Sequence, residues 1–253
     1  MDNGKHLIIF AHARTGSTSL MHLLSLHTNI SICHEPFHPS HSSWYQGSDN
    51  YLERICDRDS LDRELLKIFE RYNGIKTLTY QLPENLYEHL LLRDDTIVIS
   101  LTRRNLLQAA VSGLVAQQTK IWQKSDIDKT RSGAVTHLDP LPIEELRQTI
   151  SYMYELDSTY SEILAKKPSS SVLKLTYEDL FSTSLKSNRD VLKGVFEFLK
   201  LEMPGSDTVD TLLDPAKTKV TSNDTYQMIP NALEINRELG SENLGWLFPL
   251  SSP

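Results

Sequence analysis

A short turn near the amino terminus carries residue types that bind phosphate or sulfate. A buried apolar run, Leu7 to Phe10, leads into His-Ala-Arg-Thr-Gly-Ser-Thr-Ser at residues 12–19. Gly16 permits a tight turn, and Arg14 adds a fork-shaped cation. Such a turn points backbone N–H groups and the positive end of a helix dipole at one place. The candidate anion-binding residues are Arg14, Thr15, Gly16, Ser17, Thr18 and Ser19. A capped helix with a solvated Arg14 is the alternative.

The turn differs from the loop of ordinary nucleoside-triphosphate enzymes, which reads Gly-x-x-x-x-Gly-Lys-Ser/Thr. Here Ala11 stands at the first glycine and Ser17 stands at the lysine. The turn therefore resembles a phosphate loop without being the kinase version. A kinase-like phosphotransferase and a catalytically silent nucleotide-binding domain remain as alternatives.

A second candidate anion site follows the predicted strand Thr96 to Leu101. Arg104 lies just after this strand, and Ser112 lies eight residues further on. Eight residues are a little over two helical turns, so both side chains could flank one ligand group. The neighbouring Arg103 is compatible with either a surface position or a ligand contact.

Alternating strands and helices are predicted to position these residues. The expected strands are Leu7–Phe10, Ile30–Cys33, Ile75–Tyr80, Thr96–Leu101 and Val172–Leu175. Helices are expected after residue 17, from about Tyr51 to Tyr72, from the second site to about Thr119, from Ile143 to Lys166, and as two short helices after the last strand. This order is typical of an α/β fold with a parallel central sheet flanked by helices, which binds ligands beyond the carboxyl ends of its strands.

One domain accounts for the whole chain, residues 1–253, with a core at about 6–200. A long loop is predicted at residues 120–142. The segment at about 204–253 is predicted to be irregular, with a short helix near residues 233–239.

Composition excludes several classes of protein. The net charge is −7, so a basic field for nucleic acid is absent. Cys33 and Cys56 cannot form a disulfide framework, which favours a reducing compartment. The apolar run His6 to Ala11 is too short for a signal segment or a membrane span. We therefore expect a cytoplasmic protein, and the sequence predicts no oligomeric state.

The motifs together resemble the PAPS-dependent sulfotransferase superfamily, where PAPS is 3′-phosphoadenosine-5′-phosphosulfate; the resemblance is closest to bacterial carbohydrate and small-molecule members. The turn at residues 14–18 resembles the 5′-phosphosulfate loop, and Arg104 with Ser112 resembles the 3′-phosphate motif. Residues 173–180, Leu-Lys-Leu-Thr-Tyr-Glu-Asp-Leu, resemble a strand and helix found late in that fold. Residues 229–234 weakly resemble a carboxyl-terminal segment of the bacterial members.

The resemblance implies a P-loop-like fold and transfer of a sulfuryl group from PAPS to a hydroxyl or amine by in-line displacement. The acceptor would be a small molecule or a carbohydrate, and the by-product would be 3′-phosphoadenosine-5′-phosphate (PAP). The family needs no metal for transfer. By resemblance, Arg14, Gly16, Ser17 and Thr18 hold the 5′-phosphosulfate. Arg104 and Ser112 hold the 3′-phosphate.

Sulfuryl transfer also needs a group that accepts a proton from the acceptor. Glu35 follows the second predicted strand and precedes a proline, as in bacterial and carbohydrate sulfotransferases in which such a Glu is proposed as the base. Burial beside the donor could raise its pKa into a useful range. His34 is the second choice because histidine titrates near neutral pH, and His12 and His38 rank behind it. A Glu35 that only orients the loop or binds the acceptor is the alternative. Arg14 would stabilise charge on the leaving group.

Two loops are candidates for contact with the acceptor. Residues 37–51 include Trp44 and Tyr45, and a second loop covers residues 122–137. Aromatic and hydroxyl side chains suit a sugar or a polar natural product, and they suit a solvated lid nearly as well. The sequence does not identify the acceptor.

Overall fold

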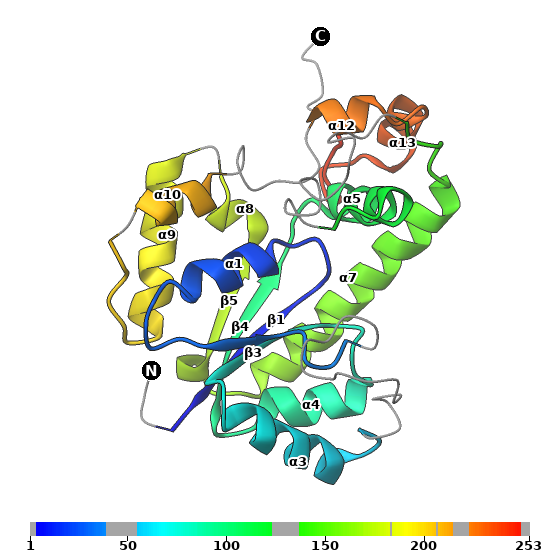
Figure 1. Cartoon of the computed structure of the whole chain (residues 1–253). Helices are drawn as coiled ribbons and strands as arrows, with labels where there is room; N and C mark the ends of the chain where they lie inside the picture. Colours follow the sequence, from blue (N-terminus) through cyan, green and yellow to red (C-terminus); the bar gives the residue numbers. More distant parts are fainter. Residues whose placement is uncertain are drawn as a thin grey trace.

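A parallel five-stranded sheet forms the centre of the fold (Figure 1). The computed structural model describes residues 4–38, 55–122, 137–182, 184–205, 207–214 and 223–248. The strands are β1 (His6–Ala11), β2 (Ile32–His34), β3 (Gly74–Leu78), β4 (Thr96–Thr102) and β5 (Val172–Thr176). Their order is β2-β3-β1-β4-β5, and every neighbouring pair is parallel. The predicted parallel sheet is therefore confirmed, with strand ends shifted by one or two residues.

Helices cover both faces of the sheet because alternate strand residues point to opposite sides. From β1, Leu7 and Ile9 pack on one face, and Ile8 and Phe10 pack on the other. The first face is covered by α1 (Ser17–Leu24), α8 (Tyr177–Leu180), α9 (Leu185–Phe198) and α10 (Asp207–Leu213). The second face is covered by α3 (Arg58–Phe69), α4 (Glu84–Leu92) and α7 (Ile143–Ala165). Figure 1 shows these two layers above and below the sheet.

A third apolar cluster lies beyond the sheet, around α5 (Leu106–Thr119). It contains residues of α7, α12 (Asn223–Gln227) and α13 (Ala232–Leu239). The chain after residue 204 was predicted to be irregular apart from one short helix, and its described part also contains α10 and α12, which were not predicted. The short helix predicted near residues 233–239 is present as α13.

Two helices on the second face differ from the sequence prediction. α3 begins at Arg58 rather than near Tyr51, because the Asp57 side chain caps the helix by accepting from Ser60 N at 2.8 Å. The helix α4 was not predicted, although its sequence has two signals of a helix. Pro83 precedes it, and its buried face has helical spacing, with Leu86, Tyr87, Leu90 and Leu91. A short 3₁₀ turn, η1 (Ser169–Ser171), leads into β5.

Most of the two candidate acceptor loops lies outside the described residues. Residues 39–54, which include Trp44 and Tyr45, and residues 123–136 are among those not described. Within the part of the chain that is described, no helix is long and apolar enough to cross a membrane.

Candidate functional site

The turn between β1 and α1 has two residues with left-handed backbone conformation. Arg14 has φ 64° and Gly16 has φ 82°. A Cβ atom at position 16 would lie 2.9 Å from both the Tyr177 and the Phe181 ring. Gly16 is therefore required by the backbone conformation and by the close approach of α8. The turn itself was predicted, whereas the packing of α8 against it was not.

The hydroxyl residues of the turn have different surroundings. Thr15 is fully buried, and its Oγ1 donates to the carbonyl oxygen of His12 at 2.8 Å. Ser17 is buried at the start of α1, whereas Thr18 and Ser19 are partly exposed. The Thr15 hydroxyl thus stabilises the turn. The first N–H groups of α1 have no partner within the helix, which is the geometry that suits an anion.

Arg14 joins the two predicted anion motifs. Its Nε donates to Ser112 Oγ at 3.0 Å, across 98 residues of sequence. Its Nη1 donates to the carbonyl oxygen of Trp122 at 2.6 Å. Burial lowers the pKa of the Arg14 guanidinium, and the positive charge of Arg103 lowers it further. The structure therefore places Ser112 of α5 directly beside the first turn.

Arg104 has different partners. Its side chain is 60% exposed, and Nη1 donates to Asp179 Oδ1 at 2.9 Å. The Glu178 carboxylate accepts from the backbone N–H groups of Arg104 and Asn105, at 2.9 and 3.0 Å. The structure brings Ser112 to Arg14 and Arg104 to the acidic residues of α8. The assignment of Arg104 and Ser112 to a 3′-phosphate stays a prediction.

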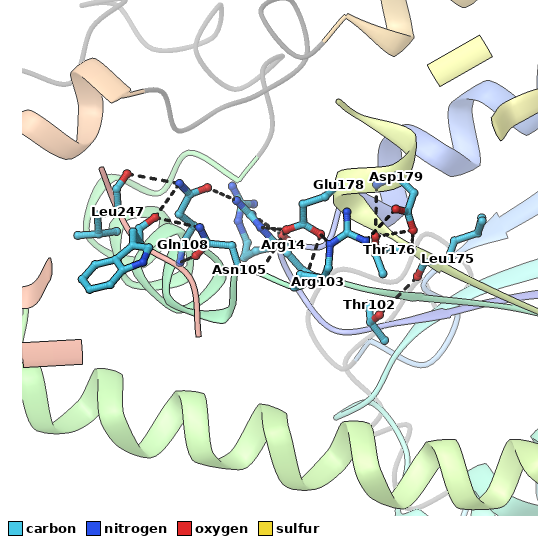
Figure 2. Close-up of polar contacts among 12 residues, drawn as sticks. Arg14, Thr102, Arg103, Asn105, Gln108, Leu175, Thr176, Glu178, Asp179 and Leu247 are labelled. Carbon is cyan, nitrogen blue, oxygen red and sulfur yellow. Dashed lines mark hydrogen bonds and ion pairs between the residues drawn. The ribbon is translucent and has the colours of Figure 1, made fainter. Parts of the chain in front are cut away.

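Arg103 is buried, so a surface position is ruled out for this residue. It is 6% exposed, and its guanidinium lies 4.6 Å from the centre of the Tyr177 ring. Nη1 donates to the carbonyl oxygen of Arg14 at 2.9 Å, and Nη2 donates to Gln108 Oε1 at 2.8 Å. Figure 2 shows Arg103 between Arg14, Gln108 and Glu178. Its surroundings depend on tertiary packing, which the sequence did not reveal.

Glu35, the predicted base, forms a buried ion pair that sequence reasoning missed. Lys76 of β3 is 2% exposed and its Nζ contacts Glu35 Oε1. Gln81 Nε2 donates to Glu35 Oε2 at 2.7 Å. Burial acts to raise the pKa of Glu35, but the charge and hydrogen bond of Lys76 hold it below its ordinary value. The available signal was a lysine inside a predicted strand, because a lysine that such a strand buries needs an anionic partner.

His34 lies beside the same carboxylate. Its Nε2 is 3.4 Å from Glu35 Oε1. Burial, and then the positive charge of Lys76, lower the pKa of His34 to about 4. The imidazole is therefore neutral at pH 7. The backbone of Glu35 has φ 49°, which places the carboxylate on a turn immediately after β2.

His12, which ranked behind Glu35 and His34, is held on both ring nitrogens. Nε2 lies 2.8 Å from Asp157 Oδ1 on α7, and Nδ1 lies 3.0 Å from Thr79 Oγ1 beyond β3. The side chain is buried. Since both nitrogens are occupied, His12 connects the start of the turn to β3 and α7.

The charges at the carboxyl edge of the sheet favour an anionic ligand. Arg14 and Arg103 lie just beyond the carboxyl ends of β1 and β4, and Lys76 lies within β3, two residues before its carboxyl end. Besides burial, Arg103 lowers the pKa of Arg14, and Arg14 lowers the pKa of Lys76. Burial is the larger cause of both shifts, and repulsion between the cations adds to it; a bound anion would relieve that repulsion. Among the described residues, there is no group of three or more His, Cys, Asp or Glu that could hold a metal ion.

The fold is that of known sulfotransferases. No protein-family model matches this sequence, and no curated protein matches it significantly. The sulfotransferase domain from the curacin biosynthetic pathway has a TM-score of 0.50 and 15% identity, over 94% of this chain and 98% of that one. At this identity the likeness concerns the fold alone, and it confirms the predicted sulfotransferase fold at the level of structure.

Two further solved structures are more distant. The sulfotransferase domain of the Synechococcus PCC 7002 olefin synthase has a TM-score of 0.49 and 14% identity, over 99% of this chain and 92% of that one. Mouse sulfotransferase SULT7A1 complexed with PAP has a TM-score of 0.45 and 14% identity over 85% of this chain. The chain spans 66% of the length of the mouse structure.

Proposed function

We propose that this protein transfers a sulfuryl group from PAPS to a hydroxyl or amine of a small-molecule or carbohydrate acceptor. The observation that carries the proposal is the contact between Arg14 and Ser112 at 3.0 Å, which joins two predicted anion motifs at the edge of the sheet. The repulsion of Arg14 with Arg103 and with Lys76 also supports an anionic ligand here. We also propose that the whole chain forms one domain.

Donor binding uses both motifs in this proposal. The turn at residues 14–18 and the amino end of α1 hold the 5′-phosphosulfate, with backbone N–H groups and Arg14 as donors. Arg104 and Ser112 hold the 3′-phosphate. Because Arg104 contacts Asp179 in this structure, binding of the 3′-phosphate requires Arg104 to exchange a carboxylate for a phosphate. Glu178 keeps its place on the backbone N–H groups of Arg104 and Asn105.

The transfer step requires movement of one proton and stabilisation of one developing charge. Glu35 accepts the proton of the acceptor hydroxyl or amine as the new bond from that oxygen or nitrogen to sulfur forms. The bond between sulfur and the 5′-phosphate oxygen breaks at the same time, and Arg14 stabilises the charge left on that oxygen. PAP and the sulfated acceptor are the products.

Lys76 gives Glu35 a means of adjusting its basicity. While Lys76 pairs with Glu35, the pKa of the carboxyl is low and its affinity for a proton is weak. An anion near Lys76 would share the positive charge, and burial would then raise the pKa of Glu35. Under this proposal, donor binding itself makes Glu35 a stronger base. His34, which is neutral at pH 7, is the alternative proton acceptor.

Calorimetry with PAP, set against ADP with and without Mg²⁺, tests the donor class. We expect PAP to bind without Mg²⁺ and more tightly than ADP, because ADP lacks the 3′-phosphate. A preference for ADP with Mg²⁺ would replace the proposal with a kinase-like phosphotransferase. Binding of neither nucleotide would remove the proposed function and leave the fold in place.

A further inference from the structure

Arg103 is held on several sides at the junction of the two motifs. One arm of its guanidinium, Nη1, donates to the carbonyl oxygen of Arg14 at 2.9 Å, and the other arm, Nη2, donates to Gln108 Oε1 at 2.8 Å. Its face lies over the Tyr177 ring, and its Nε is 4.0 Å from Glu178 Oε1. A side chain that is 6% exposed and contacts four residues of three segments is not available for broad contact with a ligand.

The contact with Arg14 matters because of the backbone at that residue. Arg14 has φ 64°, a conformation that residues other than glycine adopt at a cost. The hydrogen bond from Arg103 to the carbonyl oxygen of Arg14 favours this conformation over the alternatives. The backbone conformation in turn decides where the Arg14 side chain points, and here it points to Ser112.

Gln108, which accepts from Arg103, also contacts the last described segment of the chain. Its Nε2 donates to the carbonyl oxygens of Trp246, at 3.1 Å, and Leu247, at 3.4 Å. Asn105 Nδ2 also donates to Trp246 O, at 2.9 Å. A continuous series of contacts therefore runs from residues 246–247 through Gln108 and Arg103 to Arg14, as Figure 2 shows for its labelled members.

We propose that Arg103 is a positioning residue that holds the donor turn, residues 12–16, in its binding conformation. The role depends on the planar guanidinium of arginine. Its two arms donate to the Arg14 carbonyl oxygen and to Gln108 Oε1, while its face packs on the Tyr177 ring. A lysine would keep the positive charge but could not reach both carbonyl groups in this geometry. The inference rests on the proposed function for its link to PAPS, whereas the effect on the turn is independent of any ligand.

The experiment compares Arg103→Lys and Arg103→Met with the wild-type chain. Hydrogen–deuterium exchange of residues 11–20 reports the order of the turn without ligand, and calorimetry with PAP reports binding. We expect faster exchange in both variants and roughly tenfold or more weaker binding of PAP, since charge-assisted hydrogen bonds are lost. Arg93→Lys is the matched control, because Arg93 is also mostly buried but pairs with Asp62 and Asp95, away from the turn. This control should lose stability without changing exchange in the turn or PAP affinity.

The outcomes separate the two proposals. If Arg103→Lys exchanges in the turn and binds PAP as the wild-type protein does, the positioning role is overturned, because a positive charge at this position would then be enough to hold the turn. If wild-type protein fails to bind PAP, the proposed function fails, and exchange in the turn still tests Arg103. If the Arg103 variants do not fold, Gln108→Ala removes one anchor of Arg103 and should give a smaller increase in exchange at residues 11–20. No increase in Gln108→Ala would then overturn the inference.

Discussion

Replacing Lys76 by methionine would test the buried ion pair most directly. Methionine keeps most of the apolar volume of lysine, but it leaves the Glu35 carboxylate without its counter-charge. Lys76 is 2% exposed and the Glu35 side chain 14% exposed. Breaking a buried pair by removing one partner costs about 3–5 kcal/mol. Because Gln81 still donates to Glu35, we expect the low end, about 3 kcal/mol, or a fall in Tm of roughly 6–12 °C for a chain of this size.

The loss should also depend on pH in a defined direction. In the wild-type protein Lys76 keeps the pKa of Glu35 below its ordinary value, so the pair stabilises the fold above the unfolded-state pKa. That contribution disappears as the pH falls through the folded-state pKa. In Lys76→Met, burial acts without Lys76 and raises the pKa of Glu35 in the folded state. The free energy of unfolding of this variant therefore falls as the pH rises past the pKa of Glu35 in the unfolded state. The difference in the free energy of unfolding between the two proteins should therefore be larger at pH 8 than at pH 5.

Urea unfolding followed by tryptophan fluorescence at both pH values measures this difference. The double variant Lys76→Met/Glu35→Gln is the comparator, because the neutral amide removes the unpaired charge and should recover much of the loss. An equal loss at pH 5 and pH 8, or a double variant no more stable than Lys76→Met, would refute the ion-pair reasoning.

Three further predictions concern the donor and the reaction. Arg104→Ala should weaken PAP binding by about 1.5–3 kcal/mol and leave binding of a 5′-only nucleotide almost unchanged in calorimetry; equal losses would contradict its assignment. Glu35→Gln should slow sulfuryl transfer to an acceptor found by screening by roughly 10²–10⁴-fold while PAP binding is kept, and unchanged turnover would move the role to His34. Gly16→Ala should lower the free energy of unfolding by about 2–4 kcal/mol in thermal unfolding, because residue 16 has a positive φ and its Cβ would meet Tyr177 and Phe181. The control Gly194→Ala, with open space around the new Cβ, should not destabilise the protein.

The sheet could be predicted because its two central strands, β1 and β4, are short apolar runs and because strands and helices alternate in a regular order. Ile97 to Leu101 and Leu7 to Ala11 are buried on both faces, and such strands have a distinct composition. The short helices at residues 84–92, 207–213 and 223–227 were not predicted. Their helical periodicity extends over few turns, so their stability depends on packing rather than on local sequence: α4 packs against α7, α10 packs against α1 and α9, and Tyr226 of α12 is buried in the third apolar cluster.

The candidate site was predictable in its residue types but not in its pairings. Glu35 meets Lys76 because the register of β2 on β3 places His34 opposite Lys76. Nothing in either segment alone specifies that register. Arg103 and Arg104 are adjacent in the sequence, yet one is buried under Tyr177 and the other is exposed beside Asp179. The end of β4 and the approach of α8 decide which arginine faces inward, and these are properties of the assembled fold.

The contacts around Arg14 also have a consequence for how the protein is made. Arg14 meets Ser112 across 98 residues, and Gln108 meets Trp246 across 138 residues. Contacts between residues so distant in sequence form late, because much of the loop-closure entropy has to be lost before they contribute. As the chain leaves the ribosome, β1 and its turn emerge long before the segment that completes their surroundings. The turn at residues 12–16 should therefore acquire its final order only after residues 246–247 have emerged and packed against Gln108, however early β1 itself is made.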